Sequence, residues 1–140
     1  DYWGEAGGWD VMIDPTLGDG CLIMAEYQDD IQVRIGLDRN VGEGYITLFN
    51  YEWGNIEEGA EYPITFDLDG EIYDGVATGI YLSGVPGADI YFDNVDFFMA
   101  IANRYTMTIY NVDGHRVDAI DLGGTQVGLG AVLECQDDMG

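Results

Sequence analysis

The chain has 140 residues, a length that fits one domain over residues 1–140, and its 47% of hydrophobic residues argue against an intrinsically disordered protein. Its 27 acidic residues, against four arginines and no lysine, give a formal net charge of -23, which repels phosphate and makes nucleic acid an unsuitable partner. No apolar run approaches the ~20 residues that span a bilayer, so we expect no transmembrane segment.

Strand patterns fill the first third of the chain. Residues 9–14 alternate apolar and polar side chains, which predicts a first strand, and residues 15–20 carry the Pro, Gly and Asp of a turn. Residues 21–27 form a nearly continuous apolar run, which is typical of a central strand covered on both faces. Asp29–Asp30 predicts another turn, and residues 31–37 alternate as a half-buried strand.

The middle of the chain continues in the same manner. Residues 51–59 lack a regular period, so we expect an irregular corner or one helical turn there, with Trp53 pointing inward. Gly75 and Gly79, inside a strand pattern, predict a bulge or a close approach of two backbones. Val85-Pro86-Gly87-Ala88 fits a type II turn, because proline stands second and glycine third. Further strands are predicted over residues 45–50, 62–68 and 72–82.

One segment departs from the β pattern. Asp93 is a good N-cap residue, Asp96 follows three residues later, and apolar residues from Phe97 onward recur at helical spacing. The pattern predicts a short helix over about residues 94–103, lying over the sheet.

A hairpin follows over residues 105–122, with Asp-Gly at its tip. A two-residue type I′ loop pairs Ile109 with Asp118 and buries a carboxylate among apolar neighbours. A three-residue loop puts Gly114 in the left-handed position and pairs Ile109 with Val117. The apolar match favours the three-residue loop and the register that comes with it.

Residues 125–136 place apolar side chains at helical spacing, although two glycines weaken a helix by up to ~1 kcal/mol each, and we expect a short terminal helix. Short strands separated by turns, with one or two short flanking helices, predict a mainly β fold. Its architecture is expected to be an antiparallel β-sandwich or a barrel-like sheet.

The two cysteines, Cys21 and Cys135, allow a reactive thiol, a metal site or a disulfide. A structural zinc site needs about four Cys or His ligands, and His115 is the only imidazole that could serve as a base. A chain that begins at Asp1 rather than Met suggests a processed, exported protein, in which disulfides form readily. We therefore expect a Cys21–Cys135 disulfide and a periplasmic or extracellular location.

Acidic residues gather in turns, above all Asp67, Asp69 and Glu71 in "DLDGE". Hard cations prefer several oxygen ligands, so this turn is the candidate calcium site, and Ca²⁺ is the one cofactor considered. The EF-hand pattern is absent, and turn chemistry by itself explains Asp and Gly at such positions. The acidity as a whole fits either adaptation to salt or a cationic partner.

Aromatic residues supply the candidate interaction surface. We select Tyr2 and Trp3 at the glycine-rich start, Trp53 in the irregular segment, and Phe97 and Phe98 in the predicted helix. The leading hypothesis is a non-catalytic exported binding or accessory protein that contacts another protein or a larger assembly. The alternative is a calcium- or carbohydrate-binding module, and an enzyme is disfavoured because no nucleophile or metal signature is present.

The motifs Gly20-Cys21, "IGLD", the Trp53 segment followed by Ile56, Gly59 and Tyr62, and the late "LEC" resemble those of an uncharacterised family of small exported β-rich domains of alphaproteobacterial and marine bacterial type. The resemblance covers most of the chain. It implies export and paired cysteines, and it carries no catalytic residue.

Overall fold

A computed structural model describes residues 1–27, 31–93 and 95–140, and the predicted turn at Asp29–Asp30 lies outside these residues. Within them the protein forms one antiparallel sheet of ten strands, in the order β1-β2-β3-β4-β5-β8-β7-β6-β9-β10. The strands are β1 (Tyr2–Ala6), β2 (Trp9–Asp14), β3 (Gly20–Glu26), β4 (Ile31–Asp38), β5 (Glu43–Asn50), β6 (Glu61–Leu68), β7 (Glu71–Leu82), β8 (Val85–Phe92), β9 (Thr106–Asn111) and β10 (Arg116–Asp121).

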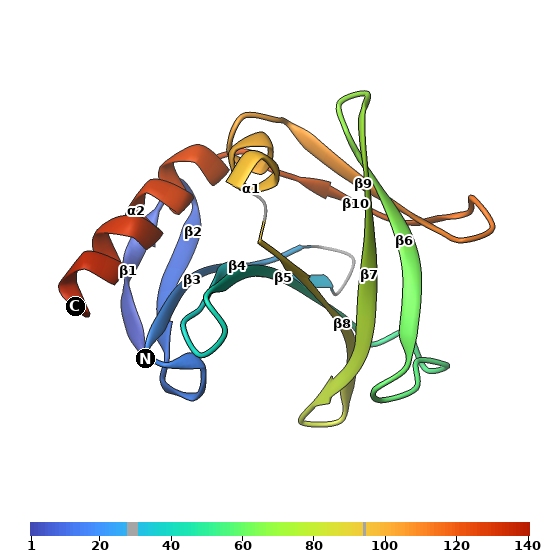
Figure 1. The fold of residues 1–140 in the computed structure, drawn as a ribbon, viewed down its shortest axis with the longest axis horizontal. Coiled ribbons are helices and arrows are strands. Elements are labelled where there is room, and N and C mark those ends of the chain that lie inside the picture. Colours follow the sequence, from blue (N-terminus) through green and yellow to red (C-terminus); the bar gives the residue numbers. More distant parts are fainter. Residues whose placement is uncertain (28–30, 94) are drawn as a thin grey trace.

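The sheet curls around an interior without closing (Figure 1). A five-stranded meander leads from β1 to β5, and a second meander, β6 to β8, returns so that β8 pairs with β5. This order leaves β1 and β10 as the two edges. The predicted mainly β, antiparallel fold with two flanking helices is confirmed, and a single curled sheet takes the place of a two-sheet sandwich.

Alternation along the central strands separates an inner apolar face from an outer face. Ile35 pairs with Ile46 and Leu48 pairs with Ala88, and these side chains belong to the buried core. Their neighbours at odd spacing point to the other side of the sheet, as the period of two requires. Strands β4, β5 and β8 therefore present a second set of side chains outward, which forms the candidate site described below.

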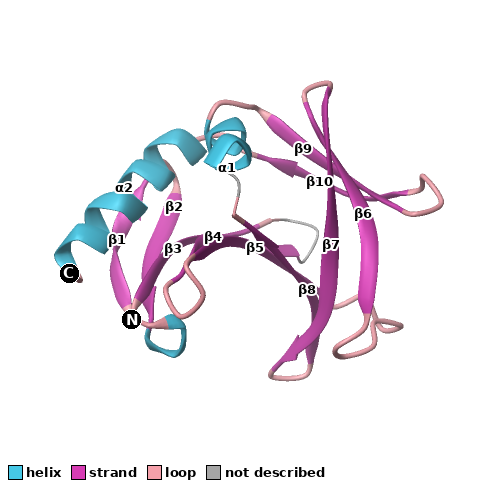
Figure 2. Cartoon of the chain, viewed as in Figure 1, coloured by secondary structure: helices cyan, strands magenta, loops and turns pink. Residues whose placement is uncertain are grey.

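Two helices cover one side of the curl (Figure 2), α1 (Val95–Ala102) and α2 (Thr125–Asp138). The predicted terminal helix is confirmed, and so is the earlier helix, although Asn94 and the side chain of Asp96 lie outside the described residues. Helix α2 packs against β2 and β3, where a disulfide joins Cys21 to Cys135 as predicted. Because the bond consumes both thiols, neither cysteine is a reactive thiol or a metal ligand, and both residues are fully buried.

The predicted strands are present, Gly75 pairs with Ile64 without a bulge, and one further strand lies at the N-terminal end. The glycine-rich start forms strand β1 by pairing with β2, which the sequence pattern did not indicate. The predicted close approach at Gly79 is confirmed, because its N–H donates to the Ala60 carbonyl and its carbonyl accepts from Gly59. Among the described helices, none is both long and apolar enough to cross a bilayer.

The type II turn predicted over residues 85–88 is wrong. Ser83 and Gly84 have φ angles of 52° and 82°, and Leu82 pairs with Val85 around them, as in a two-residue type I′ hairpin. Pro86 and Gly87 lie inside strand β8 instead. Proline is tolerated near the start of a strand, because its missing N–H does not remove a hydrogen bond between strands there.

The predicted hairpin between β9 and β10 has the correct loop, but the strand register differs from the prediction beyond Arg116. Gly114 has a φ of 80° and donates to the Asn111 carbonyl at 3.0 Å, so the three-residue loop is confirmed. The predicted pairing of Ile109 with Val117 is wrong, because a bulge at Val117 places Asp118 opposite Ile109. The bulge turns Ile120 into the core, and this burial outweighs the better local match of Val117.

Candidate functional site

The outer face of β4, β5 and β8 carries a row of polar side chains in direct register. Arg34 pairs with Thr47, and Thr47 pairs with Asp89, so the three side chains cross the sheet side by side. The Thr47 hydroxyl donates to Asp89 Oδ1. A guanidinium and a carboxylate are therefore fixed on a rigid surface rather than on a mobile loop.

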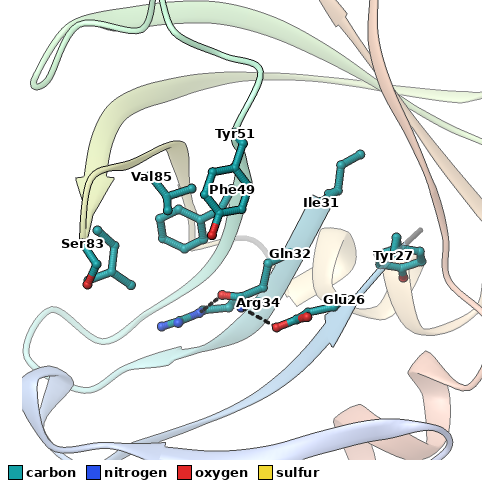
Figure 3. A pocket seen from close by; sticks show the side chains of 10 residues that line it. Glu26, Tyr27, Ile31, Gln32, Arg34, Phe49, Tyr51, Ser83 and Val85 are labelled. Atoms are coloured by element: carbon teal, nitrogen blue, oxygen red, sulfur yellow. Dashed lines mark hydrogen bonds between the residues drawn. The ribbon is translucent and has the colours of Figure 1, made fainter. Parts of the chain in front are cut away.

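Arg34 is held in place on two sides (Figure 3). Its Nε donates to Gln32 Oε1 at 2.9 Å, and Gln32 Nε2 donates in turn to Glu26 Oε1 at 3.3 Å. Its guanidinium carbon lies 5.4 Å from the centre of the Phe49 ring, a cation–π contact. Among residues 1–27, 31–93 and 95–140, none accepts a hydrogen bond from the two terminal nitrogens of Arg34.

Phe49 owes its position to Gly87. A Cβ added to Gly87 would meet the Phe49 ring at 2.6 Å, so the missing side chain lets the ring lie flat on strand β8. Phe49 is 6% exposed, although it faces away from the core. The ring and the guanidinium thus form one stacked unit on the outer face.

A groove of about 290 Å³ runs beside this unit (Figure 3). Its polar side includes Glu26, Gln32 and Arg34, and its apolar side includes the exposed side chains of Tyr51 and Leu82. The β7–β8 turn forms one bank. The lining residues are Glu26, Tyr27, Ile31, Gln32, Arg34, Phe49, Tyr51, Leu82, Ser83 and Val85.

A smaller hollow of about 180 Å³ lies on the other side of Arg34 and contains Asp89, Tyr45 and Tyr91. Burial raises the pKa of the Asp89 carboxyl, while the Thr47 hydroxyl and Arg34 act in the opposite direction. Burial also raises the pKa of Tyr45 and of Tyr91, and the hydroxyl of Tyr91 donates to Asp38 at 2.8 Å. The tyrosines therefore stay neutral and act as hydrogen-bonding groups.

The chemistry of this surface suits recognition. Arg34 offers two nitrogens to a carboxylate, Phe49 and Tyr51 offer ring surface, and Asp89 offers an acceptor on the far side. His115, the one imidazole in the sequence, is exposed next to the β9–β10 turn and is not among the residues that line either hollow.

The aromatic residues selected from the sequence do not come together. Tyr2 is exposed on edge strand β1, and the half-buried Trp3 packs against the core from the same strand. Trp53 is half-buried in the β5–β6 connection. Phe97 lies within the core on α1, where the centres of its ring and the Phe66 ring are 5.3 Å apart. Its neighbour Phe98 is half-buried on the same helix.

The acidic turn selected as a calcium site uses its carboxylates within the fold. Asp67 accepts from the Gly70 N–H at 2.6 Å, and Asp69 accepts from the Tyr105 N–H at 2.7 Å. Glu71 forms an ion pair with Arg104 and accepts from the Tyr73 hydroxyl. Among residues 1–27, 31–93 and 95–140, no group of three His, Cys, Asp or Glu side chains is arranged to hold a metal ion.

The groove around Arg34 was not predicted from the sequence. One signal was present, since Arg34 is one of only four basic residues and stands on the polar side of an alternating strand. Arg34 interacts with Phe49 on β5 and with Asp89 on β8, and only the pairing of these strands brings the three side chains together.

The chain is similar in structure to invasion associated protein B from Bartonella henselae, with a TM-score of 0.67 and 13% sequence identity. The match covers 95% of this chain and 96% of that chain, so the whole curled sheet is shared with a bacterial β-rich protein. At this identity the similarity shows a common fold. The sequence matches no protein-family model, and the comparison with curated proteins finds no match.

Proposed function

We propose that the protein is a non-catalytic, exported binding protein that holds a segment of a partner protein in the groove beside Arg34. The observation that carries this proposal is the Arg34 guanidinium, stacked on Phe49 and tied by Gln32 through Nε alone. A preorganised guanidinium loses little side-chain freedom when it binds a carboxylate, which makes it an effective anchor.

The ligand is expected to combine a carboxylate with an apolar or aromatic group. The carboxylate is placed on the free nitrogens of Arg34, and the apolar group lies against Tyr51 and Leu82 on the facing bank. An aspartate, a glutamate or a chain terminus next to an aromatic residue has this composition. The strongly acidic remainder of the surface then weakens binding of polyanions and favours a single, correctly placed carboxylate.

Export is supported by the buried Cys21–Cys135 disulfide, since such bonds persist in oxidising compartments. The states of the two cysteines and of His115 support the proposal that the protein is not an enzyme. Both cysteines are oxidised, and His115 lies in the open beside a turn. A general base must instead lie within hydrogen-bond reach of a bound substrate.

The experiment is an NMR titration of the isotopically labelled protein with millimolar N-acetylphenylalanine, which carries a ring and a carboxylate. We expect shifts at the Arg34 Nε and at groove amides, and weaker shifts with the corresponding amide compound. In Arg34→Gln the groove amides should no longer shift. Arg116→Gln, which removes the same charge on β10, is the matched control and should titrate like the wild type.

Two results would overturn the proposal. One is the absence of any groove shift, and the other is equal shifts with the carboxylate and its amide, since Arg34 would then have no selective role. Shifts with an oligosaccharide such as maltotriose, in place of the carboxylate ligand, would support the carbohydrate-binding alternative instead.

A further inference from the structure

A second, different hollow opens at the far end of the curled sheet. It has a volume of about 390 Å³ and lies between the β5–β6 connection and the β9–β10 hairpin. Its inner wall is formed by core residues, and its mouth by half-buried or exposed ones. The lining comprises Leu48, Trp53, Asn55, Ile56, Tyr62, Pro63, Ile64, Ala77, Ala88, Ile90, Ile109, Asn111, Val112 and Val117.

The inner wall is apolar and contains two small side chains where space is needed. Ala77 and Ala88 point inward from β7 and β8, in register with Ile90 and Leu48 respectively. Larger residues at these two positions would fill the volume between the neighbouring Leu and Ile side chains. The hollow therefore extends the apolar interior to the surface, at the kind of place where curled sheets and barrels hold small ligands.

The charge of this lining differs from that of every other hollow described. It includes no carboxylate and no guanidinium, in a chain where 22% of residues are charged. The two outer-face hollows contain Glu26, Asp89 and Arg34, and the hollow between the β4–β5 turn and α1 contains Asp38 and Arg39. An uncharged lining selects against an ionic ligand, because burying an unpaired charge is costly.

The mouth adds hydrogen-bonding groups that are neutral. Asn111 Oδ1 accepts from the N–H groups of Asp113 and His115, which leaves the amide nitrogen of its side chain as a donor. The Tyr62 hydroxyl accepts from the Glu57 N–H at 2.9 Å. The backbone N–H groups of Glu57 and Asp113 donate to these two lining residues, and both acidic residues are exposed, so their charge disfavours an anionic head group at the mouth.

We propose that this hollow, which we call the interior pocket, binds an uncharged apolar ligand, an alkyl chain or ring whose exposed end carries a neutral hydrogen-bonding group. The chain or ring contacts the wall around Ala77 and Ala88, and the neutral end meets the Asn111 amide. This site is separate from the groove at Arg34, so the two proposals stand or fall independently.

The test uses the fluorescent probe N-phenylnaphthylamine, which is apolar and uncharged. We expect saturable binding that dodecanol displaces and that laurate, the anion of equal chain length, displaces more weakly at neutral pH. Val117→Asp puts a carboxylate at the mouth and should weaken probe binding about tenfold or more, because the charge must be desolvated when the ligand enters.

Val127→Asp is the matched control, since it makes the same change at an exposed position on α2. It should leave probe affinity within about twofold of the wild type, and a thermal melt of both variants verifies that they fold. Equal effects of the two substitutions, or no saturable binding by the wild type, would overturn the proposal. So would displacement by laurate as strong as that by dodecanol.

A second measurement uses the tryptophan fluorescence of the wild-type protein. A long-chain alcohol brominated at its far end should quench Trp53, which lines the pocket, and leave Trp3 and Trp9 on the β1–β2 hairpin unaffected. The quenching should disappear in Trp53→Phe, in which Trp3 and Trp9 are the remaining tryptophans. Quenching that persists in this variant would place the ligand elsewhere and contradict the proposal.

Discussion

The end of the sheet formed by β1, β2 and β3 is covered by α2 and cross-linked to it, whereas the end formed by β6, β9 and β10 is held by strand pairing and core packing. At the first end, the Cys21–Cys135 disulfide is reinforced by the Trp9 indole, which donates to the Gly123 carbonyl at 3.2 Å, and by Gln136, which accepts from the Cys21 N–H at 2.9 Å. At the second end lies the mouth of the interior pocket, with Val112 and Val117 exposed.

The difference indicates how the fold divides its tasks. The cross-linked end resists local opening, whereas the end without a disulfide can open locally at a lower free energy. Such local opening lets a ligand enter the interior pocket. The outer groove lies between the two ends on strands paired on both sides, which suits a preorganised surface. The comparison can be tested by weakening each end in turn.

Replacing Cys21→Ser and Cys135→Ser together should have the largest effect. The bond closes a loop with a sequence separation of 114, and its loss is expected to lower the free energy of unfolding by ~4–5 kcal/mol in the loop-closure account, or ~2–5 kcal/mol in common experience. Urea unfolding with and without reductant measures it. Reductant should destabilise the wild type and leave the double variant unchanged, and a loss below ~1 kcal/mol would contradict the pinned-end interpretation.

Gly79→Ala tests the second end. An added Cβ would lie 2.2 Å from the Glu57 carbonyl oxygen, in backbone that cannot move without losing the hydrogen bonds between Gly79 and the β5–β6 connection. We expect a loss of ~1–3 kcal/mol, measured by urea unfolding, together with altered binding in the neighbouring interior pocket.

Gly130→Ala is the control for that substitution. Gly130 is an exposed position of α2 with no atom near the added Cβ, so alanine should stabilise the protein by ~0.5–1 kcal/mol. Similar destabilisation by both substitutions would show that crowding at Gly79 is not the cause.

Tyr27→Phe addresses the link between the two ends. The Tyr27 hydroxyl, just beyond β3, donates to the Asp121 carbonyl of β10 at 2.6 Å, so it joins strands from opposite sides of the opening. Its removal should cost ~0.5–1.5 kcal/mol at neutral pH, measured by urea unfolding. Hydrogen exchange should become faster in β10 and remain slow in β2 and β3, and uniform acceleration would contradict the comparison.

Tyr27 also makes the stability of the folded protein depend on pH in the alkaline range. Burial, and then the nearby Asp121 carboxylate, raise the pKa of Tyr27 from its usual 10.0 to about 12. The folded state therefore holds the proton more tightly than the unfolded state, and this stability is complete below pH 10 and lost as the pH rises towards 12. Thermal melts across this range should show a shallower decline in Tyr27→Phe, with Tyr45 and Tyr91 accounting for the remainder.

The smallest expected effect is in the outer groove. Arg34 lowers the pKa of Asp89 against the larger effect of burial, so Arg34→Gln should raise this pKa further. Carboxyl carbon chemical shifts followed against pH measure the change. Arg116→Gln, on a strand away from Asp89, should leave the titration of Asp89 unchanged, and an equal shift in both variants would point to net charge rather than to the local contact.

Local patterns were a reliable guide where one face of an element is buried and its neighbours are close in sequence. Strands β2 to β7, helix α2 and the three-residue loop at Gly114 follow from alternation, helical spacing and turn chemistry. Packing explains one of the two glycines that weaken α2, since Gly128 lets the helix approach Ile23 of β3, while Gly130 is exposed with no atom near it. In these elements the local preference and the final burial agree.

The sequence by itself determined the mainly β class, the disulfide as the sole use of two cysteines, and the exclusion of a membrane-spanning apolar segment. The tertiary structure alone decided the bulge at Val117, the stacking of Arg34 on Phe49 and the interior pocket. The physical reason is the separation in sequence between the residues whose interactions stabilise each feature. Alternation and turn preferences act between neighbours in the chain, while burying Ile120 or seating a guanidinium depends on strands that meet only when the sheet curls.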